Sequence, residues 1–289
     1  MSESVQAAIR TRARELLELG EISCVIGYER SPRGRVRPAF VHEPRESDRL
    51  IWDDQCHHNL VVFLHDYKST SRRGEPSRVA IVAKPCDVRA LNVLLHEGQI
   101  ERDAVFVIGV ACAGMSVDVP GGELQARCLR CRERVPVFYD ALVGDPPDTE
   151  PEAEEWDDVK ELEGMSVEER LAFWTREFDR CIRCYACRQA CPGCYCFECM
   201  VEQVDPLWVG IALELPEKAF FHVMRAYHLA GRCVECDACE QACPMHIPLS
   251  LLNRKLAMEV EALFGYRPGG DPDTPPPLAT FRKDEELPL

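Results

Sequence analysis

Two cysteine runs of identical spacing constrain the folding of this 289-residue chain more than any other feature. In each run four cysteines are separated by two, two and three residues, and a proline follows the last one. The first run extends from Cys181 to Pro192 and the second from Cys233 to Pro244. Thiolates at such short, repeated intervals are typical ligands of metal centres, so the chain must fold around these two loops.

The spacing is that of two-cluster ferredoxins, in which the fourth cysteine of each run binds the cluster of the other run. Three cysteines of one loop can bind three corners of a cubane iron–sulfur cluster. The proline suits the first turn of the helix that follows the fourth cysteine. The spacing predicts one [4Fe-4S] cluster on Cys181, Cys184, Cys187 and Cys243, and a second on Cys233, Cys236, Cys239 and Cys191. Zinc is the alternative metal, because its sites also use closely spaced cysteine pairs.

The residues around the two runs predict a mostly α-helical, ferredoxin-like domain over 166–266. Ser166 and Glu169 form the pattern of a capping box, which predicts the start of a helix. Val167, Leu171, Trp174 and Phe178 then recur at helical spacing and predict a core-facing stripe. Two further helices are expected over 218–230 and 249–264. The segment between the runs is too long for a minimal ferredoxin built from two hairpins.

The first 145 residues predict an α/β domain with parallel strands. An apolar helix pattern covers 5–19 and a short strand pattern covers 22–28. Buried-type strands are predicted over 79–83 and 104–110, with a helix over 88–95 between them. A strand, a helix and a strand of these lengths form a crossover unit whose two strands are parallel.

A second group of cysteines belongs to this α/β part. Cys86 follows the first strand of the crossover unit, Cys112 follows the second, and Cys128 and Cys131 form a C-x2-C pair. The carboxyl ends of parallel strands meet at one edge of a sheet, where such folds place their sites. Cys86 also stands at a predicted helix N-terminus, which lowers the pKa of a thiol. The group predicts a third iron–sulfur cluster, with a zinc ion or unmetallated thiols as the alternatives.

A third group, Cys194, Cys196 and Cys199, is not needed by a ferredoxin. Two interpretations are equally open. Either these cysteines are additional metal ligands, together with Cys24 or Cys56, or they are thiols packed beside a cluster.

Composition limits the function classes. The net charge of −15 argues against binding to nucleic acid, whose phosphates require Lys and Arg. No run of about 18 apolar residues is present, so no membrane span is expected. The N-terminus lacks the apolar core of a signal peptide, and a cytoplasmic location is predicted. Neither a dinucleotide-binding nor a phosphate-binding glycine motif occurs.

Two further segments are defined by composition alone. Residues 146–165 are rich in Asp and Glu with a single Lys, and predict an acidic linker. Residues 267–289 are rich in proline and predict an extended tail.

Four short motifs resemble one known family. They are Val82-Ala-Lys-Pro-Cys-Asp-Val-Arg-Ala-Leu91, Gly109-Val-Ala-Cys112, Cys128-Leu-Arg-Cys131 and Tyr139-Asp-Ala-Leu-Val-Gly144. They resemble the beta subunits of coenzyme-dependent (deazaflavin) hydrogenases and formate dehydrogenases. The second half, from Arg180 onward, looks like the dicluster extension of relatives in this family, some of which accompany heterodisulfide-reductase-like complexes.

The resemblance implies an iron–sulfur electron-transfer subunit of a cytoplasmic anaerobic oxidoreductase complex. Its partners would be hydrogenase, formate dehydrogenase or heterodisulfide-reductase-like subunits, or a ferredoxin. Some members of the family hold FAD, and Lys84 is a candidate contact for a flavin phosphate. The glycine- and cysteine-rich segment that opens the hydrogenase members has no counterpart before Cys86.

Two other functions remain as alternatives. One is a flavin-containing catalytic beta subunit that exchanges electrons between a hydride carrier and the clusters. The other is a zinc-binding scaffold without redox function.

Overall fold

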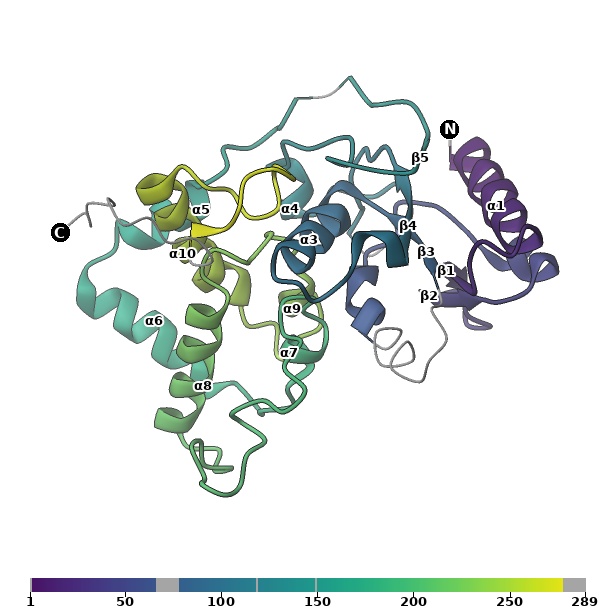
Figure 1. The fold of residues 1–289 in the computed structure, drawn as a ribbon. Helices are drawn as coiled ribbons and strands as arrows, with labels where there is room; N and C mark the ends of the chain where they lie inside the picture. Colours follow the sequence, from purple (N-terminus) through teal and green to yellow (C-terminus); the bar gives the residue numbers. More distant parts are fainter. Residues whose placement is uncertain (1, 66–77, 118, 149, 278–289) are drawn as a thin grey trace, which may run out of the picture. The chain divides into compact units, whose positions relative to one another are not determined.

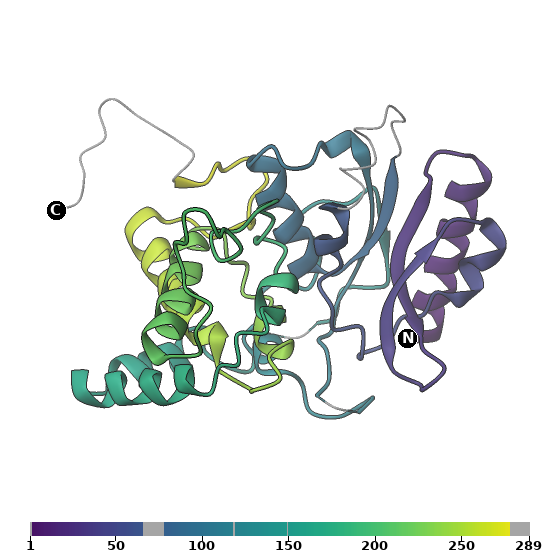
Figure 2. The ribbon, with the colours of Figure 1, turned by 90° about the horizontal axis from the view of Figure 1, so that it is seen from below.

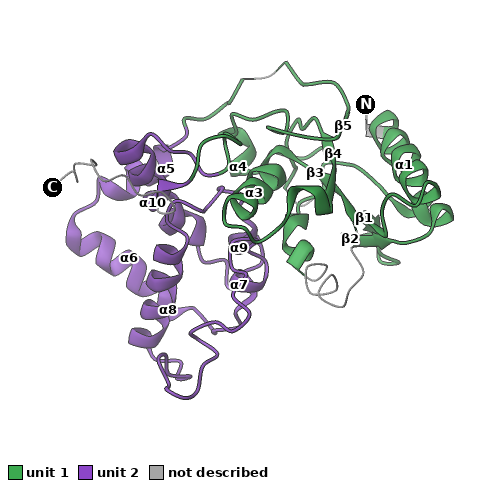
Figure 3. Cartoon of the chain, viewed as in Figure 1, with its two compact units in different colours: residues 1–154, 269–275 green, residues 155–268, 276–289 purple. Residues whose placement is uncertain are grey.

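The computed structural model describes residues 2–65, 78–117, 119–148 and 150–277. The chain forms two compact units (Figure 3). Unit 1 contains the residues up to 154 together with 269–275, and unit 2 contains 155–268 together with 276 and 277 of the described part. The chain therefore passes from unit 1 into unit 2, returns to unit 1 over 269–275, and enters unit 2 again at residue 276.

Unit 1 is built on a five-stranded sheet with the strand order β2-β1-β3-β4-β5 (Figure 1). The strands are β1 Cys24–Arg30, β2 Val36–Val41, β3 Val79–Ala83, β4 Val105–Val110 and β5 Ala141–Val143. β2 is antiparallel to β1, whereas β1, β3, β4 and β5 are mutually parallel neighbours. The prediction of an α/β fold with parallel strands is confirmed.

The helices of unit 1 cover both faces of this sheet. α1 (Ser2–Glu18) and α3 (Pro85–His96) lie on opposite sides of it (Figure 2). All residues of β3 and β4 are buried, which explains their continuous apolar sequences. The shorter elements are the 3-10 helices η1 Pro44–Arg49, η2 Leu60–Phe63 and η3 Arg102–Ala104, and the helix α4 Ala126–Leu129.

Helix α3 begins three residues earlier than the sequence predicts, at Pro85 and not at Val88. Pro85 suits this position because the first turn of a helix needs no backbone donor there. The Asp87 carboxylate accepts a hydrogen bond of 2.9 Å from the backbone N–H of Lys84. The turn Lys84–Asp87 thus places Cys86 inside the first helical turn, directly after β3.

Unit 2 consists of helices and the loops that connect them. They are α5 Asp157–Glu163, α6 Val167–Asp179, α7 Ala186–Gln189, α8 Leu215–His228, α9 Ala238–Gln241 and α10 Leu249–Phe264. α6 and α10 both pack against α8, and α7 packs against α9. None of the helices within the described ranges is both long and apolar enough to cross a bilayer.

The capping box of α6 forms as predicted, but the apolar stripe of this helix is only half buried. Ser166 Oγ accepts from the Glu169 N–H at 3.2 Å, and the Glu169 carboxylate accepts from the Ser166 N–H at 2.8 Å. Val167 and Leu171 are 66% and 67% exposed, so the prediction that they are core residues was wrong. Phe178 is buried because the last turn of α6 contacts α8, where its ring stacks on His222 with the centroids 5.0 Å apart.

The segments predicted as linker and tail both carry structure. The acidic segment contains α5, whose Val159 and Leu162 are buried. In the proline-rich segment, the carbonyl oxygens of Gly269 and Asp271 accept from Asn92 Nδ2 at 3.3 and 3.1 Å. The predicted tail from residue 278 onward lies outside the described residues.

Candidate functional site

The two cysteine runs have a left-handed backbone at equivalent positions. In the first run Arg183 and Tyr185 have φ of 52° and 59°, and in the second Glu235 and Asp237 have φ of 59° and 53°. These residues stand two and four positions after the first cysteine of each run, and none of them is glycine. Left-handed backbone at a residue with a Cβ is unfavourable and persists only where the surroundings enforce it. Its repetition in both loops indicates a shared structural role.

This conformation turns backbone N–H groups toward the cysteine sulfurs. The Arg183 N–H donates to Cys181 Sγ at 3.3 Å. In the second run the Glu235 N–H forms the equivalent bond to the Cys233 thiol. Alternating left- and right-handed residues create concave sets of N–H donors that bind anions, including iron–sulfur clusters. The loops therefore fit a negatively charged group held by cysteine sulfur.

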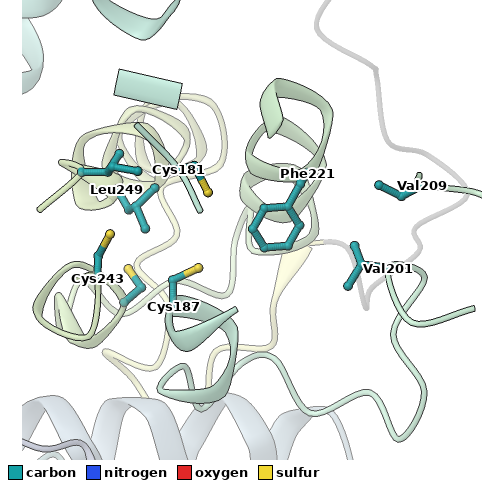
Figure 4. Close-up of a cluster of buried hydrophobic side chains, with 9 residues drawn as sticks. Cys181, Cys187, Val201, Val209, Phe221, Cys243 and Leu249 are labelled. Atoms are coloured by element: carbon teal, nitrogen blue, oxygen red, sulfur yellow. The ribbon is translucent and has the colours of Figure 1, made fainter. Parts of the chain in front are cut away.

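The first predicted ligand set surrounds one small cavity in unit 2. Its four cysteines, together with Met245 and Ile247, line this space. Figure 4 shows Cys181, Cys187 and Cys243 from two separate loops around a core that also holds Phe221 and Leu249. Cys184 is exposed, so one side of the set reaches the surface.

The second predicted ligand set also combines the two runs. Cys191, the fourth cysteine of the first run, acts electrostatically on Cys233 and on Cys239. Burial raises the pKa of Cys233 well above its ordinary value, and Cys239 and Cys236 raise it further. Asn253 Nδ2 donates to Cys239 Sγ at 3.7 Å, which adds a side-chain donor to this set. Each set thus draws three cysteines from one run and one from the other.

These arrangements fit the cluster prediction in their backbone donors and in their ligand grouping. The part of the chain that the structure describes has no group of three or more His, Cys, Asp or Glu side chains poised to hold a single metal ion. That these two sets hold iron–sulfur clusters stays a prediction.

Cys194, Cys196 and Cys199 all line one cavity of about 250 Å³ in unit 2. Its other walls are mainly apolar, and they include Met200, Val209, Phe221 and Leu229. A hydrogen bond from Cys194 lowers the pKa of the Cys191 thiol to about 6. The third group therefore lies next to the second ligand set. Cys24 and Cys56, the other ligands considered for it, are buried in unit 1.

In unit 1, Cys112, Cys128 and Cys131 lie close together after the carboxyl end of β4. Burial raises the pKa of Cys112 to about 11, and the neighbouring Cys128 and Cys131 raise it as well. The Met115 N–H donates to Cys128 Sγ at 3.3 Å, and the Cys131 thiol donates to the Glu133 carbonyl at 3.2 Å. The structure thus brings together three of the four cysteines predicted for a third centre.

The fourth, Cys86, neighbours a buried polar group at the end of β3. Lys84, only 1% exposed, donates from Nζ to the His58 carbonyl at 2.8 Å and to the Tyr28 hydroxyl. Its Nζ also lies 2.9 Å from Asp87 Oδ2. Burial lowers the pKa of Lys84, but Asp87 and Cys86 outweigh it, so the pKa is raised and the ammonium stays charged.

The Lys84 ammonium therefore has a partner inside the chain for each of its three N–H groups. Its predicted contact with a flavin phosphate stays a prediction. Tyr28 and His58 were not among the predicted site residues. The place of Asp87 in the first helical turn could have been predicted, because an acidic residue directly after Pro85 is typical of a helix start.

Comparison with known proteins points to one kind of subunit. No family model matches the chain. The F420-dependent formate dehydrogenase subunit beta of Methanocaldococcus jannaschii is 24% identical, over 69% of this chain and 76% of that protein. The F420-dependent formate dehydrogenase 1 subunit beta of Methanococcus maripaludis is 23% identical, over 71% of this chain and 76% of that protein. The resemblance to this beta-subunit family is confirmed, and it supports an oxidoreductase subunit.

Proposed function

We propose that this chain, a relative of the beta subunits of F420-dependent formate dehydrogenases, is an iron–sulfur electron-transfer subunit of a cytoplasmic anaerobic oxidoreductase complex. The observation that carries the proposal is the pair of equivalent left-handed loops in unit 2, each paired with the fourth cysteine of the other. Neither a packed core nor a disulfide framework needs this repetition.

Two [4Fe-4S] clusters would be held by the two ligand sets described above. When bound, such clusters supply one-electron transfer. The Arg183 and Glu235 N–H groups donate to ligand sulfur, and such hydrogen bonds stabilise the added negative charge of a reduced cluster. The exposed Cys184 brings the first set to the surface, where a partner can exchange electrons with it.

A third centre in unit 1 is part of the proposal. Cys112, Cys128 and Cys131 would supply three ligands, and Cys86 would supply the fourth. Their position after β3 and β4 is the edge at which parallel sheets place their sites. Unit 1 would then be the place where electrons enter or leave the chain.

A catalytic beta subunit with a flavin is the second candidate. The names of the two relatives favour it, because both enzymes depend on F420. A deazaflavin carries hydride, so a chain that passes its electrons to clusters needs a centre that splits electron pairs, such as a flavin. The zinc scaffold is the third candidate.

The partners would be other subunits of the complex, of the formate dehydrogenase, hydrogenase or heterodisulfide-reductase-like kind, or a ferredoxin.

Anaerobic purification with quantification of iron, sulfide, zinc and flavin tests the proposal. We expect about eight iron atoms per chain from two cubane clusters, and about twelve if the third centre is one too. Fewer than four iron atoms, with no absorbance shoulder near 400 nm, would overturn it, and zinc in place of iron would establish the scaffold. Stoichiometric flavin together with F420 oxidation would favour the catalytic subunit.

A further inference from the structure

Arg225 lies between the two cysteine sets of unit 2. It stands on α8 one helical turn after Phe221, whose ring belongs to the same core as Cys181, Cys187 and Cys243 (Figure 4). The side chain is 7% exposed, and its Nη2 donates to the Cys187 carbonyl at 3.1 Å. Its Nε has no hydrogen-bond partner in the described part of the chain.

The guanidinium lies near cysteines of both sets. Burial by itself lowers the pKa of Arg225, but Cys239, Cys191, Cys194 and Cys187 raise it, and the result lies well above the ordinary value. Cys187 belongs to the first predicted set, whereas Cys191 and Cys239 belong to the second. The guanidinium thus bonds to the Cys187 carbonyl in the first set and to the Cys191 side chain in the second. An Arg side chain keeps its charge at any ordinary pH, so Arg225 is a cation beside a member of each set.

No carboxylate neutralises this cation among the residues that the structure describes. Two other buried cations of unit 2 do have such partners: Arg188 pairs with Glu202 at 2.6 Å, and Arg254 pairs with Asp158 and Glu235. A third, Arg183, bonds to the Gly210 and Ala212 carbonyls and to the Tyr185 hydroxyl. An isolated buried charge is strongly unfavourable, so a buried guanidinium without an acidic partner requires other negative charge nearby. Cysteine thiolates of bound clusters would provide it.

We propose that Arg225 is a positioning residue that sets the reduction potentials of both clusters jointly, an inference that rests on the proposed function. An added electron on either cluster is attracted by the same fixed cation. Charges interact strongly in a buried, weakly polar surrounding, so one guanidinium can stabilise the reduced form of both. It also offsets the repulsion between two negatively charged clusters, and thus makes the second reduction easier.

The test is a redox titration of the full chain, purified anaerobically and followed by electron paramagnetic resonance. In Arg225→Gln we expect both cluster couples to become more negative. The equilibrium constant for each one-electron reduction should fall at least tenfold, which corresponds to about 59 mV. The matched control is Arg176→Gln, which removes a cation of the same unit whose side chain is 64% exposed, and should leave both couples unchanged.

Arg225→Lys separates charge from shape. Lys keeps the charge but concentrates it on one compact group, so it cannot face both sets as the planar guanidinium does. We expect smaller shifts than with Gln, and unequal ones for the two couples. This variant also carries the test if Arg225→Gln fails to load iron, because unshifted potentials in an iron-loaded Arg225→Lys chain contradict the proposal.

The possible failures are distinguishable. A wild-type chain without iron overturns the proposed function, and this inference with it. Iron-loaded Arg225→Gln with both potentials unchanged, or with only one changed, overturns the joint role of Arg225 and leaves the proposed function standing.

Discussion

Tyr185 and Asp237 are structural equivalents in two loops of different sequence. Each has a left-handed backbone, with φ of 59° and 53°, and each directly precedes a short helix, α7 or α9. The two loops thus share a conformation that is uncommon for residues other than glycine. The shared conformation supports the proposal that both loops hold the same kind of group.

The first prediction concerns this conformation at Asp237. A β-branched residue is a true outlier at positive φ, so Asp237→Val should strain the second loop by about 1–3 kcal/mol. We expect the iron content to fall by about four atoms per chain, which is one cubane cluster. Asp237→Asn is the control, because Asn tolerates this conformation, and it should keep full iron. Full iron in the Val variant would contradict the prediction.

The second prediction concerns the exchange of ligands between the runs. Cys181→Ser and Cys243→Ser should leave the same surviving cluster, because both residues belong to the first set. Cys233→Ser and Cys191→Ser should leave the other cluster. Electron paramagnetic resonance spectra of the four reduced variants provide the comparison. If the spectrum of Cys243→Ser matched that of Cys233→Ser, each run would hold its own cluster and the exchange would be disproved.

The third prediction concerns the buried pair of Lys84 and Asp87, whose Nζ and Oδ2 lie 2.9 Å apart. Lys84→Met leaves a buried carboxylate without its partner, so the free energy of unfolding should fall by about 3–5 kcal/mol. Adding Asp87→Leu should recover part of this loss. The control is Arg14→Met, which breaks an exposed ion pair with Asp48 and should change stability by less than about 1 kcal/mol. Denaturant unfolding measures all three, and equal effects of Lys84→Met and Arg14→Met would refute the argument.

The fourth prediction concerns Gly269, which has a φ of 67°. A Cβ at this position would lie 2.1 Å from the Arg89 carbonyl oxygen, so Gly269→Ala should detach residues 269–275. Gly265 provides the control, since its φ is 60° and a Cβ there would meet nothing within 4 Å. Gly265→Ala should cost only about 1–2 kcal/mol of backbone strain. Hydrogen exchange should become faster over 269–275 in Gly269→Ala but not in Gly265→Ala. Equal protection of this segment in both variants would contradict the prediction.

The fifth prediction concerns the pH dependence of stability. Burial lowers the pKa of His222 to about 4, and neither ring nitrogen has a hydrogen-bond partner within the described residues. In the unfolded chain His222 binds a proton near pH 6.5, whereas in the folded chain it binds one only near pH 4. The stability that buried, uncharged His222 contributes is therefore fully present above pH 6.5. It is lost as the pH falls toward 4, by up to about 3 kcal/mol.

His222→Phe removes this titration and keeps a ring for the stack with Phe178. Unfolding of wild type and variant between pH 5.5 and 7.5 gives the comparison. We expect the wild type to lose more stability than the variant toward pH 5.5. Parallel pH profiles would show that His222 does not titrate as described.

Prediction from the sequence was most successful for features that depend on residues close together in the chain. The cysteine spacing predicts which thiols can face a common group, and the structure groups those of unit 2 accordingly. The unbroken apolar runs of β3 and β4 predict buried parallel strands, because both faces of such a sheet are covered.

Features that depend on distant contacts were not predictable. The left-handed residues could not be anticipated, since none of them is glycine. The exposure of Val167 and Leu171 follows from where α6 meets α8, which helical periodicity does not reveal. Lys84 is a surface residue by type, and its burial depends on Tyr28 and His58, which are distant in sequence.

The contact of Asn92 with Gly269 and Asp271 has a consequence for biosynthesis. These residues belong to unit 1, yet the ribosome produces residues 269–271 only after all the cysteines of unit 2 have been made. N-terminal domains generally fold first during synthesis. Here residues 269–271 of unit 1 are made after the cysteines of unit 2. The nascent chain could therefore acquire the proposed clusters before its first unit is complete.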